Sequence, residues 1–114
     1  MTQEERSTTI YLVQQWASAA MRLEDASKDR PKDDLMVYYL TGEKEAWYDL
    51  QEIFIRETLP WTDARHLIDT SRQSYDANAT KDGIAPKMVK YWDGYLHALE
   101  IFEQQYSEQL KPNK

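Results

Sequence analysis

The sequence predicts an all-α protein, a single-domain antiparallel (up-down) bundle of about four helices over residues 1–114. Apolar residues recur every three or four positions through long stretches, which is the spacing of one helix face. Runs that alternate apolar and polar residues for the length of a strand are missing. Only 3 glycines and 4 prolines interrupt the chain, and they divide it into four long segments. We expect helices over about 2–27, 34–59, 62–78 and 86–110.

The first predicted helix (2–27) carries two apolar stripes. Thr2 and Glu5 have the spacing of a capping box, in which each side chain accepts a hydrogen bond from the other residue's backbone N–H. One stripe comprises Ile10, Val13, Ala17, Ala20 and Met21; the other comprises Leu12, Trp16, Ala19 and Leu23. At about 100° per residue the two stripes cover roughly half of the helix circumference. We therefore expect this helix to pack against two neighbours.

The second predicted helix (34–59) has a long apolar stripe with a glycine inside it. Asp33 is a suitable N-cap, and Pro60 stops the helix. The core stripe comprises Met36, Tyr39, Leu40, Ala46, Trp47, Leu50, Ile53 and Phe54. Gly42 costs about 1 kcal/mol relative to alanine inside a helix. Two interpretations therefore stay open, a continuous helix and a helix kinked or broken at Gly42.

The third and fourth predicted helices differ in how apolar they are. The third (62–78) starts at Thr62, and its outer face repeats charges of alternating sign, which predicts a solvated ladder of ion pairs. That ladder comprises Arg65, Asp69, Arg72 and Asp76. The fourth (86–110) begins at Pro86 and has a heptad-like seam, the pattern of helices that cross at a shallow angle. The seam comprises Met88, Trp92, Tyr95, Leu99, Phe102 and Tyr106.

Composition excludes several classes of function. The chain has no cysteine, which removes disulfides, thiolate catalysis and cysteine-based zinc sites. The formal charge of −6 disfavours direct binding to nucleic acid and suits a basic partner surface. No apolar run approaches the roughly 18 residues that a membrane span needs, and the first residues are polar and acidic. We expect a cytoplasmic protein without membrane contact and without a cofactor.

Two histidines and one glutamate are the candidates for chemistry. His66 and His97 each precede a carboxylate by three residues, but both fall opposite the apolar face of their helix and should lie in water, so no metal site is predicted. If the second helix is continuous, Glu43 falls inside the apolar arc, where an ionised carboxylate is costly and its pKa rises. Such a glutamate is either structural, bonded to a tyrosine hydroxyl, or catalytic. If the helix restarts after Gly42, Glu43 is instead a first-turn glutamate that favours the helix dipole.

Aromatic residues make up 12% of the chain, and some lie outside the core stripes. Tyr48 forms a minor stripe with Val37 and Ile55 on the back of the second helix, and Tyr11 points away from the core face of the first. Tyrosine is enriched at protein interfaces. These four residues are candidates for a docking or dimer surface; contact with a neighbouring helix is the alternative explanation.

Two functions from different classes follow. The first is a non-enzymatic interaction module that binds a protein partner or itself. In general character the chain is similar to small bacterial or phage accessory proteins, such as immunity proteins and inhibitors of defence systems, and this similarity extends to the class of protein alone. The second is a carboxylate-rich helical enzyme or divalent-metal binder centred on Glu43.

Overall fold

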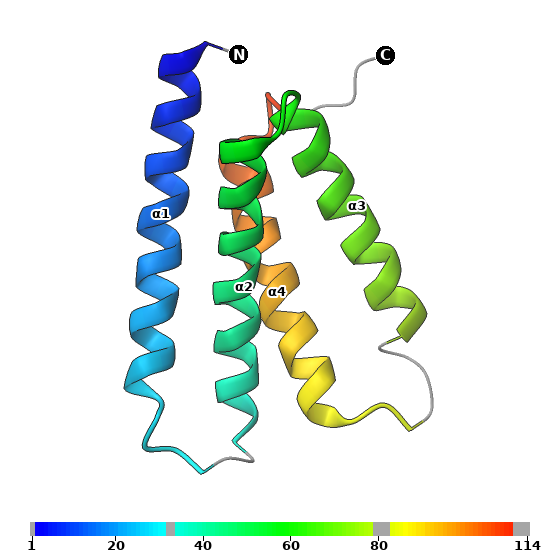
Figure 1. The fold of residues 1–114 in the computed structure, drawn as a ribbon. Helices are drawn as coiled ribbons and strands as arrows, with labels where there is room; N and C mark the ends of the chain where they lie inside the picture. Colours follow the sequence, from blue (N-terminus) through cyan, green and yellow to red (C-terminus); the bar gives the residue numbers. More distant parts are fainter. Residues whose placement is uncertain (1, 32–33, 79–82, 111–114) are drawn as a thin grey trace.

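The computed structural model confirms an all-α fold of four helices (Figure 1). The structure describes residues 2–31, 34–78 and 83–110. The helices are α1 (Gln3–Ala26), α2 (Leu35–Arg56), α3 (Pro60–Asn78) and α4 (Pro86–Gln105). In the part of the chain described, no residue lies in a strand.

The helices begin and end within three residues of their predicted positions, except that α4 ends at Gln105, five residues before the predicted 110. The Thr2 hydroxyl accepts a hydrogen bond from the Glu5 N–H (3.0 Å), which is one of the two hydrogen bonds of the predicted capping box of α1. The N-cap of α2 is Asp34, whose carboxylate accepts from the Met36 N–H (2.9 Å), whereas Asp33 lies outside the described residues. α3 starts at Pro60, two residues before the predicted Thr62, because proline suits the first turn of a helix.

α2 runs without interruption through Gly42, so of the interpretations left open the broken helix is wrong. The glycine marks a close approach between helices. A Cβ atom at Gly42 would overlap the Tyr91 carbonyl oxygen, and one at Gly94 would overlap the Tyr39 carbonyl oxygen. Each helix thus places its glycine against the backbone of the other, which brings α2 and α4 closer together than side chains would allow.

The core lies mainly between α2 and α4 and is rich in aromatic rings. Phe54 and Phe102 are fully buried at a ring-centroid distance of 5.9 Å. Trp61 from α3 meets Phe54 edge to face and stacks with Phe102. The other buried apolar residues include Val13, Ala17, Ala20, Ala46, Trp47, Leu50, Ala64, Ile68, Tyr95, Ala98 and Leu99. Since α2 contacts both α1 and α4 along much of its length, it is the central helix of the fold.

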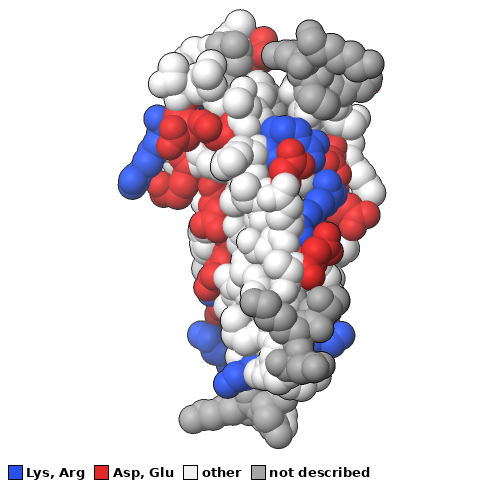
Figure 2. Space-filling view, turned by 90° about the vertical axis from the view of Figure 1, so that its right-hand side faces the viewer, with Lys and Arg blue, Asp and Glu red and all other residues white. Residues whose placement is uncertain are grey.

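α3 leans away from the other helices in Figure 1 and is tied to α4 by charge. Arg72 donates two hydrogen bonds to the Glu103 carboxylate (2.7 and 3.0 Å), and Arg65 pairs with the same carboxylate at 2.7 Å. Figure 2, which views this side, shows basic and acidic groups next to each other. Arg65 also bridges Asp69, as predicted, but the expectation of a ladder confined to the outer face is wrong because two of its arginines reach α4.

α1 has one neighbouring helix, where the sequence predicted two. Within the described residues, its backbone comes close to that of α2 and to no other helix. Lys44 and Thr41 of α2 hydrogen-bond the Glu24 carboxylate (2.8 Å each) at one end. At the other end Arg6 donates to the Phe54 and Glu57 carbonyl oxygens (2.9 and 3.0 Å), which satisfies acceptors at the C-terminal end of α2.

Candidate interaction surface

The second apolar stripe of α1 is largely uncovered. Its members are Leu12, Trp16, Ala19 and Leu23, and we call them the α1 stripe. Leu23 is 57% exposed and Trp16 is 41% exposed, while Leu12 is half-buried. Trp16 stacks on Trp47 of α2 at a ring-centroid distance of 5.2 Å, so the α1 stripe borders the core. Two large apolar side chains of the α1 stripe, Trp16 and Leu23, are therefore presented to solvent seven residues apart.

The surface predicted on α2 is more divided. The Tyr48 hydroxyl lies 3.5 Å from the Met21 sulfur of α1, so this tyrosine contacts the neighbouring helix. Ile55 is exposed and Val37 is half-buried. Tyr11 is 60% exposed on α1. The structure brings Tyr48 next to α1, and within the described residues no hydrogen bond or ring contact joins it to Val37, Ile55 or Tyr11.

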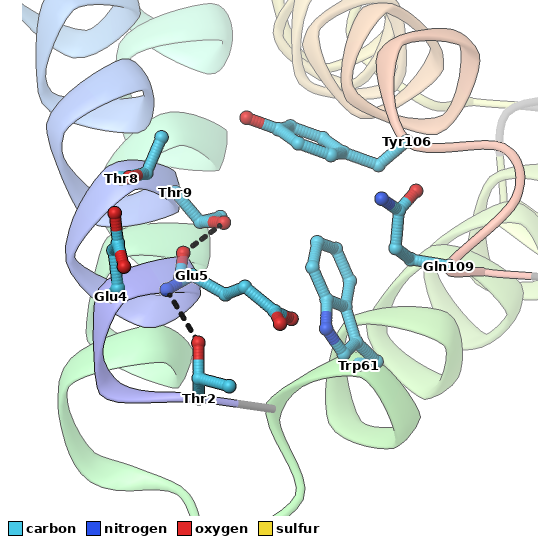
Figure 3. Close-up of a pocket in the computed structure, with 8 residues that line it drawn as sticks. All are labelled: Thr2, Glu4, Glu5, Thr8, Thr9, Trp61, Tyr106 and Gln109. Atoms are coloured by element: carbon cyan, nitrogen blue, oxygen red, sulfur yellow. Dashed lines mark hydrogen bonds between the residues drawn. The ribbon is translucent and has the colours of Figure 1, made fainter.

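A cavity of about 490 Å³ lies where α1, α3 and the residues after α4 meet (Figure 3). Glu5 reaches into it from α1, Trp61 from α3, and Tyr106 and Gln109 from the chain after α4. Glu5, Thr9 and the α1 stripe follow one another at spacings of four, three, four, three and four residues. The cavity therefore lies at the N-terminal end of the same helix face that carries the α1 stripe.

Glu43 is half-buried and faces His97, so it is not the first-turn glutamate of a restarted helix. Its Oε2 lies 3.5 Å from His97 Nδ1, and the His97 ring lies beside Tyr39. Burial raises the pKa of the Glu43 carboxyl, and the neighbouring imidazole offsets part of that rise. His97 was expected to lie in water; its side chain is 48% exposed, but it turns toward α2 because the glycine contact brings α2 and α4 close together.

Two other carboxylates of α2 accept hydrogen bonds from tyrosines of α4, which the sequence did not reveal. Tyr91 donates to Glu45, and Tyr95 donates to Asp49 (2.6 Å). Burial and these carboxylates raise the pKa of both phenols, so the tyrosines remain protonated donors. Both pairs therefore serve to hold α4 on α2. The signal that could have found them is the pair of tyrosines four residues apart on α4, matched by acids four apart on α2.

Glu43 faces one histidine, His97, and the described residues add no further side chain that could bind a metal ion with them. Among the residues that the structure describes, no three histidine or acidic side chains lie together in a way that could hold a metal ion. Likewise, none of the described helices is both long enough and apolar enough to cross a membrane. His66, the other predicted water-facing histidine, is exposed on α3.

Comparison with protein-family models, with curated proteins and with solved structures finds no match to this chain.

Proposed function

We propose that this chain is a non-enzymatic protein-interaction module that binds a helix of a partner protein along the α1 stripe. The observation that carries the proposal is the exposure of Leu23 and Trp16 on a helix that packs against one neighbour. Spacings of four, three and four residues are those of a helix that accepts another helix alongside it. Fully burying a leucine-sized side chain contributes roughly 1.5–3 kcal/mol, so a few such residues can support a specific complex.

A partner protein is favoured over a second copy by charge. The chain carries −6 overall, so two copies repel each other at long range, whereas a basic partner is attracted. Small accessory, immunity or inhibitor proteins, the class to which this chain is similar in general character, act by binding another protein. The α2 residues Val37, Tyr48 and Ile55 with Tyr11 remain a second candidate surface.

The test uses two double variants in an affinity pull-down from the source organism. Ala19→Glu with Leu23→Glu places charge on the α1 stripe, and Tyr48→Ala with Ile55→Ala trims the α2 surface. All four positions are exposed, so helicity measured by circular dichroism should stay unchanged. Exposed Gln73 and Ser74 of α3, both changed to glutamate, give a control with the same added charge.

We expect the first double variant to lose a protein that the wild type, the α2 variant and the α3 control all retain. If the first variant retains this protein and the α2 variant loses it, the interface is the α2 surface and not the α1 stripe. Sedimentation of the wild type tests self-association. If the wild type is a dimer and the Ala19→Glu, Leu23→Glu variant is a monomer, the α1 stripe binds a second copy of this chain and not a different protein.

A further inference from the structure

The cavity beside the α1 stripe has an aromatic corner. The rings of Trp61 and Tyr106 have centroids 5.3 Å apart and planes inclined at 48°. Both rings line the cavity. A cation near their faces is attracted by the ring quadrupoles, by about 0.5–2 kcal/mol depending on how much water is removed.

The cavity also holds negative charge that no neighbour neutralises. In Figure 3 the Glu5 side chain extends toward Trp61, while the Glu4 carboxylate stays close to α1 and points away from the indole. Within the described residues, no basic group forms an ion pair with Glu5. The adjacent Arg6 is engaged with the Phe54 and Glu57 carbonyls at the end of α2. The unpaired Glu5 carboxylate therefore favours a cation over an anion in the cavity.

A polar atom without a partner lies at the same place. The Tyr106 hydroxyl oxygen is buried, and within the described residues it forms no hydrogen bond. The Thr9 hydroxyl beside it donates instead to the Glu5 carbonyl (2.9 Å). A buried polar group left unpaired costs about 1–3 kcal/mol. This oxygen therefore marks a polar position in the wall of the cavity whose hydrogen-bonding capacity is not fully used.

We propose that this cavity binds the guanidinium or ammonium group of a basic side chain carried by the partner protein. Glu5 supplies the counter-charge, Trp61 and Tyr106 supply the aromatic faces, and the Gln109 amide adds a polar group at the mouth. The volume of about 490 Å³ leaves room for the aliphatic stem of an arginine or lysine. The cavity itself is defined without the partner; only the source of the cation rests on the proposed function.

The test is an NMR titration of the full chain that follows the indole N–H signal of Trp61, assigned with a Trp61→Phe variant. The probes are butylguanidinium, butylammonium and neutral butylurea, which has a similar shape and no charge. Both cations should shift the Trp61 signal to saturation, and butylurea should leave it in place. Trp92, at the far end of α4, is an internal control whose signal should not move. Equal shifts with butylurea would overturn the proposal.

Matched variants locate the charge that matters. Glu5→Gln should weaken binding of butylguanidinium about tenfold, because a charge-assisted contact is removed. Glu4→Gln removes the same charge from a neighbouring residue that also lines the cavity but whose carboxylate points away from the indole (Figure 3). It should therefore change the affinity by less than about twofold. Equal weakening by both variants would show general attraction to an acidic helix end and would overturn the proposal.

Two further arms identify the source and separate the proposals. A blocked Gly-Arg-Gly peptide should bind at least as tightly as butylguanidinium. If the peptide does not bind, the cavity accepts only small free cations, and the proposal that the cation belongs to a partner protein is refuted. If the cations fail to shift Trp61 while the Ala19→Glu, Leu23→Glu variant still loses its partner, the cation site is refuted and the interaction module stands.

Discussion

The contact between α2 and α4 and the outer side of α1 lie at opposite extremes of packing. At the first, Gly42 and Gly94 let two backbones touch, and the aromatic core closes around them. At the second, Trp16 and Leu23 project from a helix that has one neighbour. The fold buries apolar surface completely where α2 meets α4. Trp16 and Leu23 are therefore exposed because no other described helix of the chain lies against that side of α1.

The largest expected effect comes from adding a methyl group at the glycine contact. Gly94→Ala forces the Tyr39 carbonyl and the new Cβ apart, so α2 and α4 must separate. We expect a loss of about 3 kcal/mol or more in the free energy of unfolding, despite the gain of roughly 1 kcal/mol in helix propensity. Urea denaturation followed by circular dichroism measures it.

Gly83→Ala is the control for the glycine contact. Gly83 has φ 87° and nothing near its missing Cβ, so alanine there costs about 1–2 kcal/mol through backbone strain alone. A Gly94→Ala protein no less stable than Gly83→Ala would show that the two helices have room to move apart.

The two faces of α1 provide the next comparison. Val13 is 1% exposed against α2, whereas Leu23 lies on the α1 stripe. Val13→Ala should lower the free energy of unfolding by about 2 kcal/mol, because it leaves a cavity. Leu23→Ala should change it by less than about 0.5 kcal/mol in the isolated chain. A cost for Leu23→Ala as large as that for Val13→Ala would mean that the stripe is already covered in solution.

The smallest expected effect distinguishes two glutamates that are equally buried, Glu24 at 19% and Glu43 at 16% side-chain exposure. Burial alone would raise the pKa of Glu24, but hydrogen bonds from Lys44 and Thr41 outweigh it and the pKa is lowered. Burial raises the pKa of Glu43, and its weaker contact with His97 does not reverse that. The same substitution should therefore act in opposite directions.

At neutral pH, Glu24→Gln should destabilise the fold and Glu43→Gln should stabilise it, each by a few tenths of a kcal/mol up to about 1 kcal/mol. The contribution of Glu24 is present above its unfolded pKa and is lost as the pH falls through the lower folded value. The cost of Glu43 appears as the pH rises through its raised folded value, so Glu43→Gln and wild type should converge in acid. Thermal unfolding between acid and neutral pH measures both; shifts of the same sign would contradict the assignment.

The sequence was sufficient for the helices because their apolar spacing is local, and the observed ends fall close to the predicted ones. It did not reveal the role of Gly42, because that role depends on Tyr91, a residue far along the chain. The same contact turns His97 toward Glu43, which helical periodicity within α4 had placed in water. The two stripes of α1 predicted two neighbouring helices, but local spacing does not show how the other helices are placed, and the structure gives α1 one neighbour.

The glycine contact also has a kinetic consequence. The hydrogen bond from Tyr95 to Asp49 joins residues 46 positions apart, whereas α1 and α2 are consecutive along the chain. Closing a long loop costs entropy before the contacts that stabilise it can form. α1 and α2 can therefore pair early, whereas α4 can dock on α2 only after the intervening α3 has been synthesised. A newly made chain would thus expose the α2 face of its core until residues near Phe102 have been synthesised, and this interval is when it is most open to misassociation.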